Sequence, residues 1–146
     1  MAINEPFTLI ATYHPALLAL AILCFAVLTQ ALLTAPLAFI KGEQAPGSPI
    51  QGDHALLSFR ALRTHANSAE SLAPFGLSLL VAIAAGSSSS LVNWLAGLHV
   101  GFRLLFWVIY YQGIGQVAGG PRTLAFVGGL LTNMILTGTA IYALLR

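Results

Sequence analysis

Residues 58–75 read Ser58-Phe59-Arg60-Ala61-Leu62-Arg63-Thr64-His65-Ala66-Asn67-Ser68-Ala69-Glu70-Ser71-Leu72-Ala73-Pro74-Phe75. An apolar run continues from this stretch to Ala85. At about 100° per residue, steps of three and four positions return to the same side of a helix. The stretch therefore predicts a helix that carries one polar stripe into an apolar body. The members of the stripe are Arg60, Arg63, Asn67 and Glu70.

The composition indicates an integral membrane protein. Hydrophobic residues make up 58% of the 146 residues and charged residues only 7%, whereas about a quarter of the residues are charged in a typical soluble domain. Six basic and four acidic residues are too few for a nucleic-acid-binding surface. In a soluble protein the stripe would be a solvated helix end. Inside a bilayer an ionisable group is costly and usually marks function.

Four apolar runs predict an all-α integral membrane protein, a four-transmembrane-helix bundle that forms a single domain over residues 1–146. Each run is long enough to cross a bilayer, which takes about 20 residues. Residues 1–13 form a short amphiphilic lead, and residues 44–53 form a loop rich in Pro and Gly. Asp53 is the expected N-cap of the second span. The expected spans are about 14–40, 55–85, 91–112 and 122–145.

Arg103 lies near the middle of the third span, with Trp107 and Tyr110 at helical spacing on the same side. Pairing with Glu70 or with a bound anion would explain an arginine at that depth, and snorkelling towards an interface is the alternative. Pro74 cannot donate a hydrogen bond to the carbonyl of Glu70. That break in the second span is interpreted either as a packing kink or as part of a site.

The fourth span begins at Arg122 and Thr123. A guanidinium in the first turn of a helix is opposed by the helix dipole, so this position attracts an anion. Thr123 adds a hydroxyl donor, and Asn133 is expected to form an interhelical hydrogen bond. Glycines on this span allow close helix contact; they are Gly128, Gly129 and Gly138. We interpret the four scattered histidines as structural or interfacial, and they are His14, His54, His65 and His99.

Basic residues predict the orientation of the chain in the membrane. Lys41, Arg60 and Arg63 belong to the first loop and the helix that follows it, and Arg122 ends the third loop. The positive-inside rule then places the first and third loops in the cytoplasm and both termini on the opposite side. The polar stripe and Arg122 would lie near one membrane face, which suggests a single site. No metal-ligand spacing or nucleotide-binding loop is present in the sequence.

The pattern Arg60-x-x-Arg63-x-x-x-Asn67-x-x-Glu70-x-x-x-Pro74-Phe75 resembles the signature of the MAPEG family, the membrane-associated proteins in eicosanoid and glutathione metabolism. This family includes microsomal glutathione transferases, microsomal prostaglandin-E synthase, leukotriene-C synthase and a five-lipoxygenase-activating protein. The stretches 103–110 and 120–126 support the resemblance. It implies a homotrimer of four-helix subunits in the bacterial inner membrane, surrounded by lipid. Glutathione would bind between neighbouring subunits near the cytoplasmic face.

The resemblance also implies roles for individual residues. Asn67 and Glu70 would hold the glutathione backbone, with Glu70 on its α-amino group. Arg63 and Arg122 would meet its carboxylates or thiol, and Tyr110 would line the pocket. Arg122 is the expected catalytic residue, because a guanidinium that stabilises the thiolate increases the amount of nucleophile. The remaining residues expected to contact glutathione are Arg60, Arg103 and Thr123.

Together these points predict a membrane glutathione transferase that conjugates, or reduces as a peroxidase, hydrophobic substrates entering from the bilayer. The chain departs from the family where some members carry a histidine or a tyrosine and this sequence has Phe106 or Phe126. Those departures favour a second hypothesis, in which the protein is a non-catalytic lipid-binding or scaffold member of the family. A third is a small multidrug transporter, although the arginines around Glu70 would neutralise a proton-coupled carboxylate.

Overall fold

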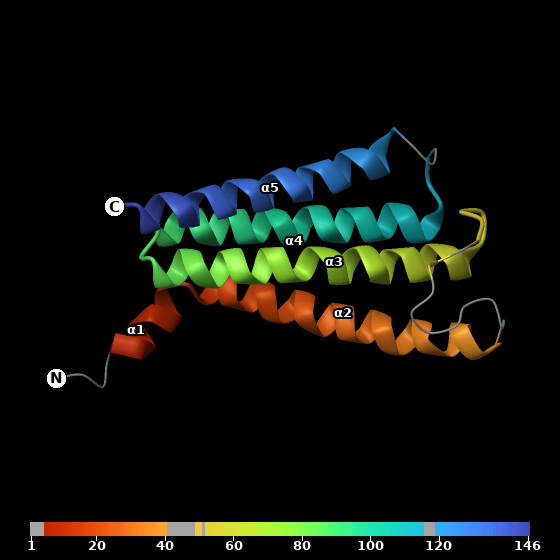
Figure 1. The fold of residues 1–146 in the computed structure, drawn as a ribbon, viewed down its shortest axis with the longest axis horizontal. Helices are drawn as coiled ribbons and strands as arrows, with labels where there is room; N and C mark the ends of the chain where they lie inside the picture. Colours follow the sequence, from red (N-terminus) through yellow and green to blue (C-terminus); the bar gives the residue numbers. More distant parts are fainter. Residues whose placement is uncertain (1–4, 41–48, 51, 116–118) are drawn as a thin grey trace.

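The computed structural model describes residues 5–40, 49–50, 52–115 and 119–146, and over these residues it contains five helices and no strand. Figure 1 shows four long helices running side by side, with the short α1 at an angle to them near the N-terminus. The helices are α1 (Glu5–Thr12), α2 (His14–Ile40), α3 (Leu57–Ala84), α4 (Ser89–Gln112) and α5 (Pro121–Leu144).

The four long helices are long and apolar enough to cross a membrane. Their bounds lie within two residues of the expected spans at every end. The chain is therefore an all-helical, multi-pass membrane protein. The amphiphilic lead contains a further helix, α1, which the sequence reading did not predict. Lys41 and most of the predicted loop at 44–53 lie outside the described residues.

The expected N-cap role of Asp53 is wrong. The N-cap of α3 is Leu56, which offers no side-chain cap. Asp53 instead closes a turn just before the helix: its Oδ1 accepts a hydrogen bond from the backbone N–H of Ala55 at 2.9 Å, and its carbonyl accepts one from Leu56 at 3.0 Å. Short aspartate side chains commonly stabilise such turns in this way.

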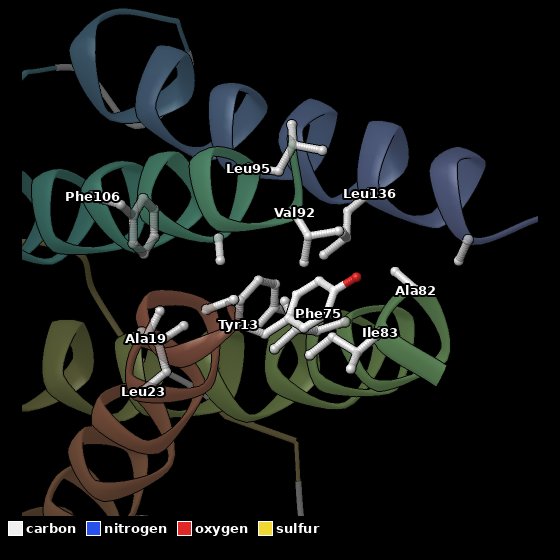
Figure 2. Close-up of a cluster of buried hydrophobic side chains, with 14 of the residues drawn as sticks. Tyr13, Ala19, Leu23, Phe75, Ala82, Ile83, Val92, Leu95, Phe106 and Leu136 are labelled. Carbon is white, nitrogen blue, oxygen red and sulfur yellow. The ribbon is translucent and has the colours of Figure 1, made fainter. Parts of the chain in front are cut away.

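Buried side chains hold α2, α3, α4 and α5 together. α2 packs on α3 and α4, and α5 packs on α4 and α3. Figure 2 shows part of the apolar cluster between them, with Phe75, Val92 and Leu136 among its members. The hydroxyl of Tyr13 donates a hydrogen bond to the carbonyl of Ser87 and so fastens the start of α2 to the turn between α3 and α4.

Glycine permits the close approach of α5 to α4 at one position in particular. A Cβ atom on Gly128 would overlap the ring of Phe102, whereas one on Gly129 would make only ordinary contacts. The expectation of close contact is therefore confirmed at Gly128. It is wrong at Gly138, where nothing lies within 4 Å of an added Cβ.

The arginines of the polar stripe and Arg122 gather at one end of the bundle, which we call the basic end. There α2 and α4 finish while α3 and α5 begin, and the opposite end holds the turn between α3 and α4 and both termini (Figure 1). The predicted convergence of Arg60, Arg63 and Arg122 at one end is thus observed in the arrangement of the helices. Which face of the membrane this end occupies remains a prediction.

Candidate functional site

A cavity of about 360 Å³ opens at the basic end between α3, α4 and α5. We call it the basic cavity. Four of the residues expected at the glutathione site from the sequence line it together with Arg122, so the predicted grouping holds for most of the set. The complete lining is His54, Arg63, Asn67, Phe106, Tyr110, Arg122, Thr123 and Phe126.

Two guanidinium groups give the basic cavity its charge. Arg122 follows Pro121, the first residue of α5, and its guanidinium carbon lies 4.8 Å above the centre of the Tyr110 ring. Arg63 lies near the start of α3 and is exposed. Neither is paired with a carboxylate in the part of the chain that the structure describes. Both charges, together with the start of α5, are therefore free to bind an anion.

Arg103 is tied to Asn67, and the expected pair with Glu70 is wrong. Its Nη2 donates to Oδ1 of Asn67 at 2.8 Å and lies 3.4 Å from Oγ of Ser68, which also accepts a hydrogen bond from Nε1 of Trp107 at 2.9 Å. Only 3% of Arg103 is exposed, so the snorkelling alternative is also wrong. The reason is geometric: Asn67 and Ser68 face α4, whereas Glu70 is exposed.

Because Arg103 does not line the basic cavity, it acts on the site through Asn67. The hydrogen bond fixes the Asn67 side-chain oxygen and leaves the amide N–H groups to face a ligand. The guanidinium carbon of Arg103 also lies 5.1 Å from the centre of the Phe106 ring. We therefore assign Arg103 no direct contact with glutathione.

A second cavity of about 180 Å³ lies further from the basic end, and we call it the inner cavity. Glu70 lines this cavity and not the basic one. Asn67 and Phe126 line both, so the two cavities adjoin. The polar stripe is therefore divided, with Arg63 on one cavity, Glu70 on the other and Asn67 between them. The inner cavity is lined by Asn67, Glu70, Ser71, Pro74, His99, Phe126, Gly129, Leu130 and Asn133.

Arg60 holds the chain before α3 against the end of α4. Its Nη1 donates to the carbonyls of His54 and Ala55 at 2.8 and 2.7 Å, and its Nε donates to the carbonyl of Tyr111 at 3.3 Å. Gly113 adopts a positive φ of 69°, and a Cβ there would press on this guanidinium at 3.2 Å. Arg60 thus lies outside the basic cavity and lines only a small space of about 40 Å³ beside Tyr110 and Arg122.

His54 is a site residue that the sequence reading missed. Its Nδ1 lies 2.8 Å from the hydroxyl of Tyr110, and its ring packs edge-on against Phe59 at 4.8 Å. Burial lowers the pKa of His54 below the ordinary value of 6.5, and the positive charges of Arg122 and Arg63 lower it further. The only signal in the sequence was its place just before the polar stripe, because no local spacing relates it to Tyr110.

The rest of the basic cavity is lined by the hydroxyl of Thr123 and by aromatic rings. Oγ1 of Thr123 accepts a hydrogen bond from the backbone N–H of Gly119 at 3.2 Å, which orients this hydroxyl at the start of α5. The rings of Phe106 and Tyr110 stack with their centres 5.5 Å apart, and Phe106 lies 6.2 Å from Phe126. The basic cavity is therefore lined by cationic and hydrogen-bonding groups together with aromatic rings.

Comparison with known proteins agrees with this arrangement. The model of the MAPEG family matches residues 12–142, which includes all four long helices almost completely. No curated protein matches the chain. The family match covers both cavities and every residue of the polar stripe. The chain therefore belongs to the MAPEG family.

Proposed function

We propose that this protein is a membrane-bound glutathione transferase that acts on hydrophobic substrates. One observation carries the proposal: two arginines without a described acidic partner line a cavity that aromatic rings also line. Such a cavity suits a ligand that is anionic at one end and reacts with an apolar molecule at the other. Membership of a family concerned with glutathione and eicosanoid metabolism supports the same activity.

The residues present fit glutathione. Its two carboxylates and its thiolate are anions, and Arg63 and Arg122 are the cations that line the basic cavity. Its α-amino group is a cation, and Glu70 supplies a carboxylate in the adjoining inner cavity. Asn67 lies between them, and its amide N–H groups can donate to the peptide carbonyls of the ligand. The charges of the site therefore match the charges of the molecule in kind.

Bound glutathione would supply a thiolate that attacks an electrophilic carbon or reduces a hydroperoxide. Arg122 is the catalytic residue in this proposal, because a neighbouring guanidinium favours the ionised thiol over the neutral thiol, whose ordinary pKa is about 8.5. The hydroxyl of Tyr110 lies 2.8 Å from Nδ1 of His54, and it can donate to the same sulfur when the His54 ring donates to it. Phe106 and Phe126 keep water from the apolar side, which strengthens the electrostatic effect of Arg122.

The proposal includes a homotrimer in which a second copy covers the exposed polar groups of α3. Glu70 and Arg63 are exposed in the single chain although α3 is a membrane span. Ionisable side chains that face lipid are costly. A neighbouring subunit packed against this face would enclose Glu70 and complete the site, and the remaining apolar faces would contact membrane lipids.

A second candidate function is non-catalytic binding of a lipid. Phe106 and Phe126 support it, because they make one wall of the basic cavity apolar where a catalytic hydroxyl or imidazole would otherwise be possible. Both candidates predict ligand binding at this end of the bundle. Only the transferase predicts that glutathione is bound and ionised there.

Calorimetric titration of glutathione into the detergent-purified protein tests the proposal. We expect the wild type to bind, and the Glu70→Gln variant to bind at least tenfold more weakly because the α-amino group loses its counter-charge. Arg146→Ala, which removes a charge at the opposite end of the bundle beside Tyr142, should bind glutathione as the wild type does. Absence of glutathione binding by a correctly folded wild type would refute the transferase and leave lipid binding.

A further inference from the structure

The inner cavity holds two buried polar side chains that the proposed function does not use. His99 on α4 is 2% exposed, and Asn133 on α5 is 8% exposed. Nε2 of His99 and Oδ1 of Asn133 are buried and have no hydrogen-bond partner among the described residues. The expectation that Asn133 forms an interhelical hydrogen bond is therefore wrong for its side-chain oxygen. Buried polar atoms without partners are rare and costly, so these two need an explanation.

His99 presents a hydrogen-bond acceptor to its surroundings. Its Nδ1 lies 3.0 Å from the carbonyl oxygen of Gly129, and a carbonyl can only accept, so the proton is on Nδ1. The ring stacks on Phe75 with the two centres 4.2 Å apart and the planes at 8°. A charged imidazolium in such surroundings is costly, which favours the neutral ring. In that tautomer Nε2 carries a lone pair and no hydrogen.

Most other polar groups of the inner cavity are acceptors as well. Oγ of Ser71 donates to the carbonyl of Ser68 at 3.1 Å, which leaves only its lone pairs for a ligand. The carboxylate of Glu70 accepts and cannot donate when ionised. Neither Arg nor Lys lines this cavity in the part of the chain that the structure describes. The amide N–H groups of Asn67 and Asn133 are its donors, so acceptors outnumber donors.

The cavity is also open on an apolar side. Leu130 is 48% exposed and Phe126 is 37% exposed, and Pro74 beside them is exposed. A volume of 180 Å³ is about six times the share of one molecule in liquid water. An apolar molecule that carries a small polar group therefore fits both the walls and the size of the space.

We propose that the inner cavity binds the O–H group of an apolar alcohol or hydroperoxide, which donates to His99 and Asn133 while its chain lies along Pro74, Phe126 and Leu130. This rests on the proposed function: it places in the inner cavity the hydroperoxide that glutathione would reduce and the alcohol that this reduction leaves. Glu70 serves the amine of glutathione in that function, which leaves His99 and Asn133 for the other molecule. Because both acceptor atoms are covered, binding includes a small side-chain movement at the cavity floor.

Two ligands, of which only one carries an O–H group that can donate a hydrogen bond, test this assignment without glutathione. Radiolabelled 1-dodecanol and its methyl ether are bound to the protein in lipid nanodiscs, and the signal of empty nanodiscs is subtracted. The wild type should bind the alcohol about tenfold more tightly than the ether, since the ether cannot donate. His99→Phe and Asn133→Leu should each remove most of this preference while leaving ether binding unchanged or stronger.

The control variant is His14→Phe, because His14 is exposed and lies at the start of α2, away from the inner cavity. It should keep the full preference for the alcohol. Equal binding of alcohol and ether by the wild type would overturn the proposal, and so would a preference that survives both His99→Phe and Asn133→Leu. Because the assay contains no glutathione, loss of the transferase proposal would leave its result unaffected.

Discussion

The hydroxyl of Tyr110 lies 2.8 Å from Nδ1 of His54, although 56 positions separate the two residues in the chain. The guanidinium of Arg122 lies over the Tyr110 ring, 4.8 Å from its centre. Nη1 of Arg60 donates to the carbonyl of His54 at 2.8 Å. The segment before α3 is therefore an integral part of the basic cavity wall.

The charge state of His54 should depend on pH in a predictable direction. Its pKa is below 6.5 in the folded protein because of burial and then of Arg122 and Arg63, so the fold favours the neutral ring. The stability that this ring contributes should be complete above pH 6.5 and should be lost as the pH falls through the lower, folded pKa. A protonated ring can only donate from Nδ1 to the Tyr110 hydroxyl, whereas a neutral ring can donate or accept there.

An NMR titration of histidine-labelled protein measures this pKa, with the signal of His54 assigned from its absence in His54→Gln. We expect a midpoint below 6.5, and a smaller loss of thermal stability between pH 7 and pH 5.5 in His54→Gln than in the wild type. His14→Gln serves as the control because His14 is exposed. A midpoint above 6.5 would show that His54 is not held beside the two arginines.

Substitution of Arg60 should lower the stability of the fold, whereas substitution of Arg63 should weaken glutathione binding. Arg60→Ala removes three hydrogen bonds to backbone carbonyls, so we expect the free energy of unfolding to fall by about 1–3 kcal/mol. Arg63→Ala removes an exposed cation without a described acidic partner. It should leave thermal stability unchanged and weaken glutathione binding several-fold. Thermal unfolding and calorimetry of both variants check this, and an unchanged stability of Arg60→Ala would contradict the contacts described.

The partner of Arg103 can be tested by two double-mutant cycles. Arg103→Met combined with Asn67→Ala should show a coupling energy of about 1–2 kcal/mol, because the two side chains share a partly buried hydrogen bond. Arg103→Met combined with Glu70→Gln should be additive within about 0.5 kcal/mol. Chemical unfolding in detergent supplies the free energies. A larger coupling to Glu70 than to Asn67 would restore the ion pair predicted from the sequence.

Patterns along the chain predicted the spans well, because long uncharged runs and their breaks are local properties. The rotation of α4 was also predictable, and Arg103, Trp107 and Tyr110 all face inward as their spacing indicates. The side chains that these residues contact were not predictable. Asn67 and Glu70 lie about one helical turn apart on α3. Which of them meets Arg103 depends on the height and the rotation at which α3 and α4 pack. The contact between His54 and Tyr110 depends on the path of a connecting segment, which no periodicity encodes.

The division of the polar stripe between two cavities could not be seen in the sequence either. Steps of three and four place Arg63, Asn67 and Glu70 on one helix face, but the stripe extends along the axis as well as around it. Asn67 on α3 and Phe126 on α5 line both spaces. The sequence therefore predicted one site where the structure has two adjoining ones.

The ionisation of bound glutathione shows whether Arg122 stabilises the thiolate. Ultraviolet absorbance of the thiolate is followed against pH for wild type, Arg122→Ala and Arg146→Ala, each saturated with glutathione. We predict that the wild type and Arg146→Ala lower the thiol pKa well below its ordinary value of about 8.5, and that Arg122→Ala returns it close to that value. An Arg122→Ala variant that binds glutathione and ionises its thiol as the wild type does would contradict the account.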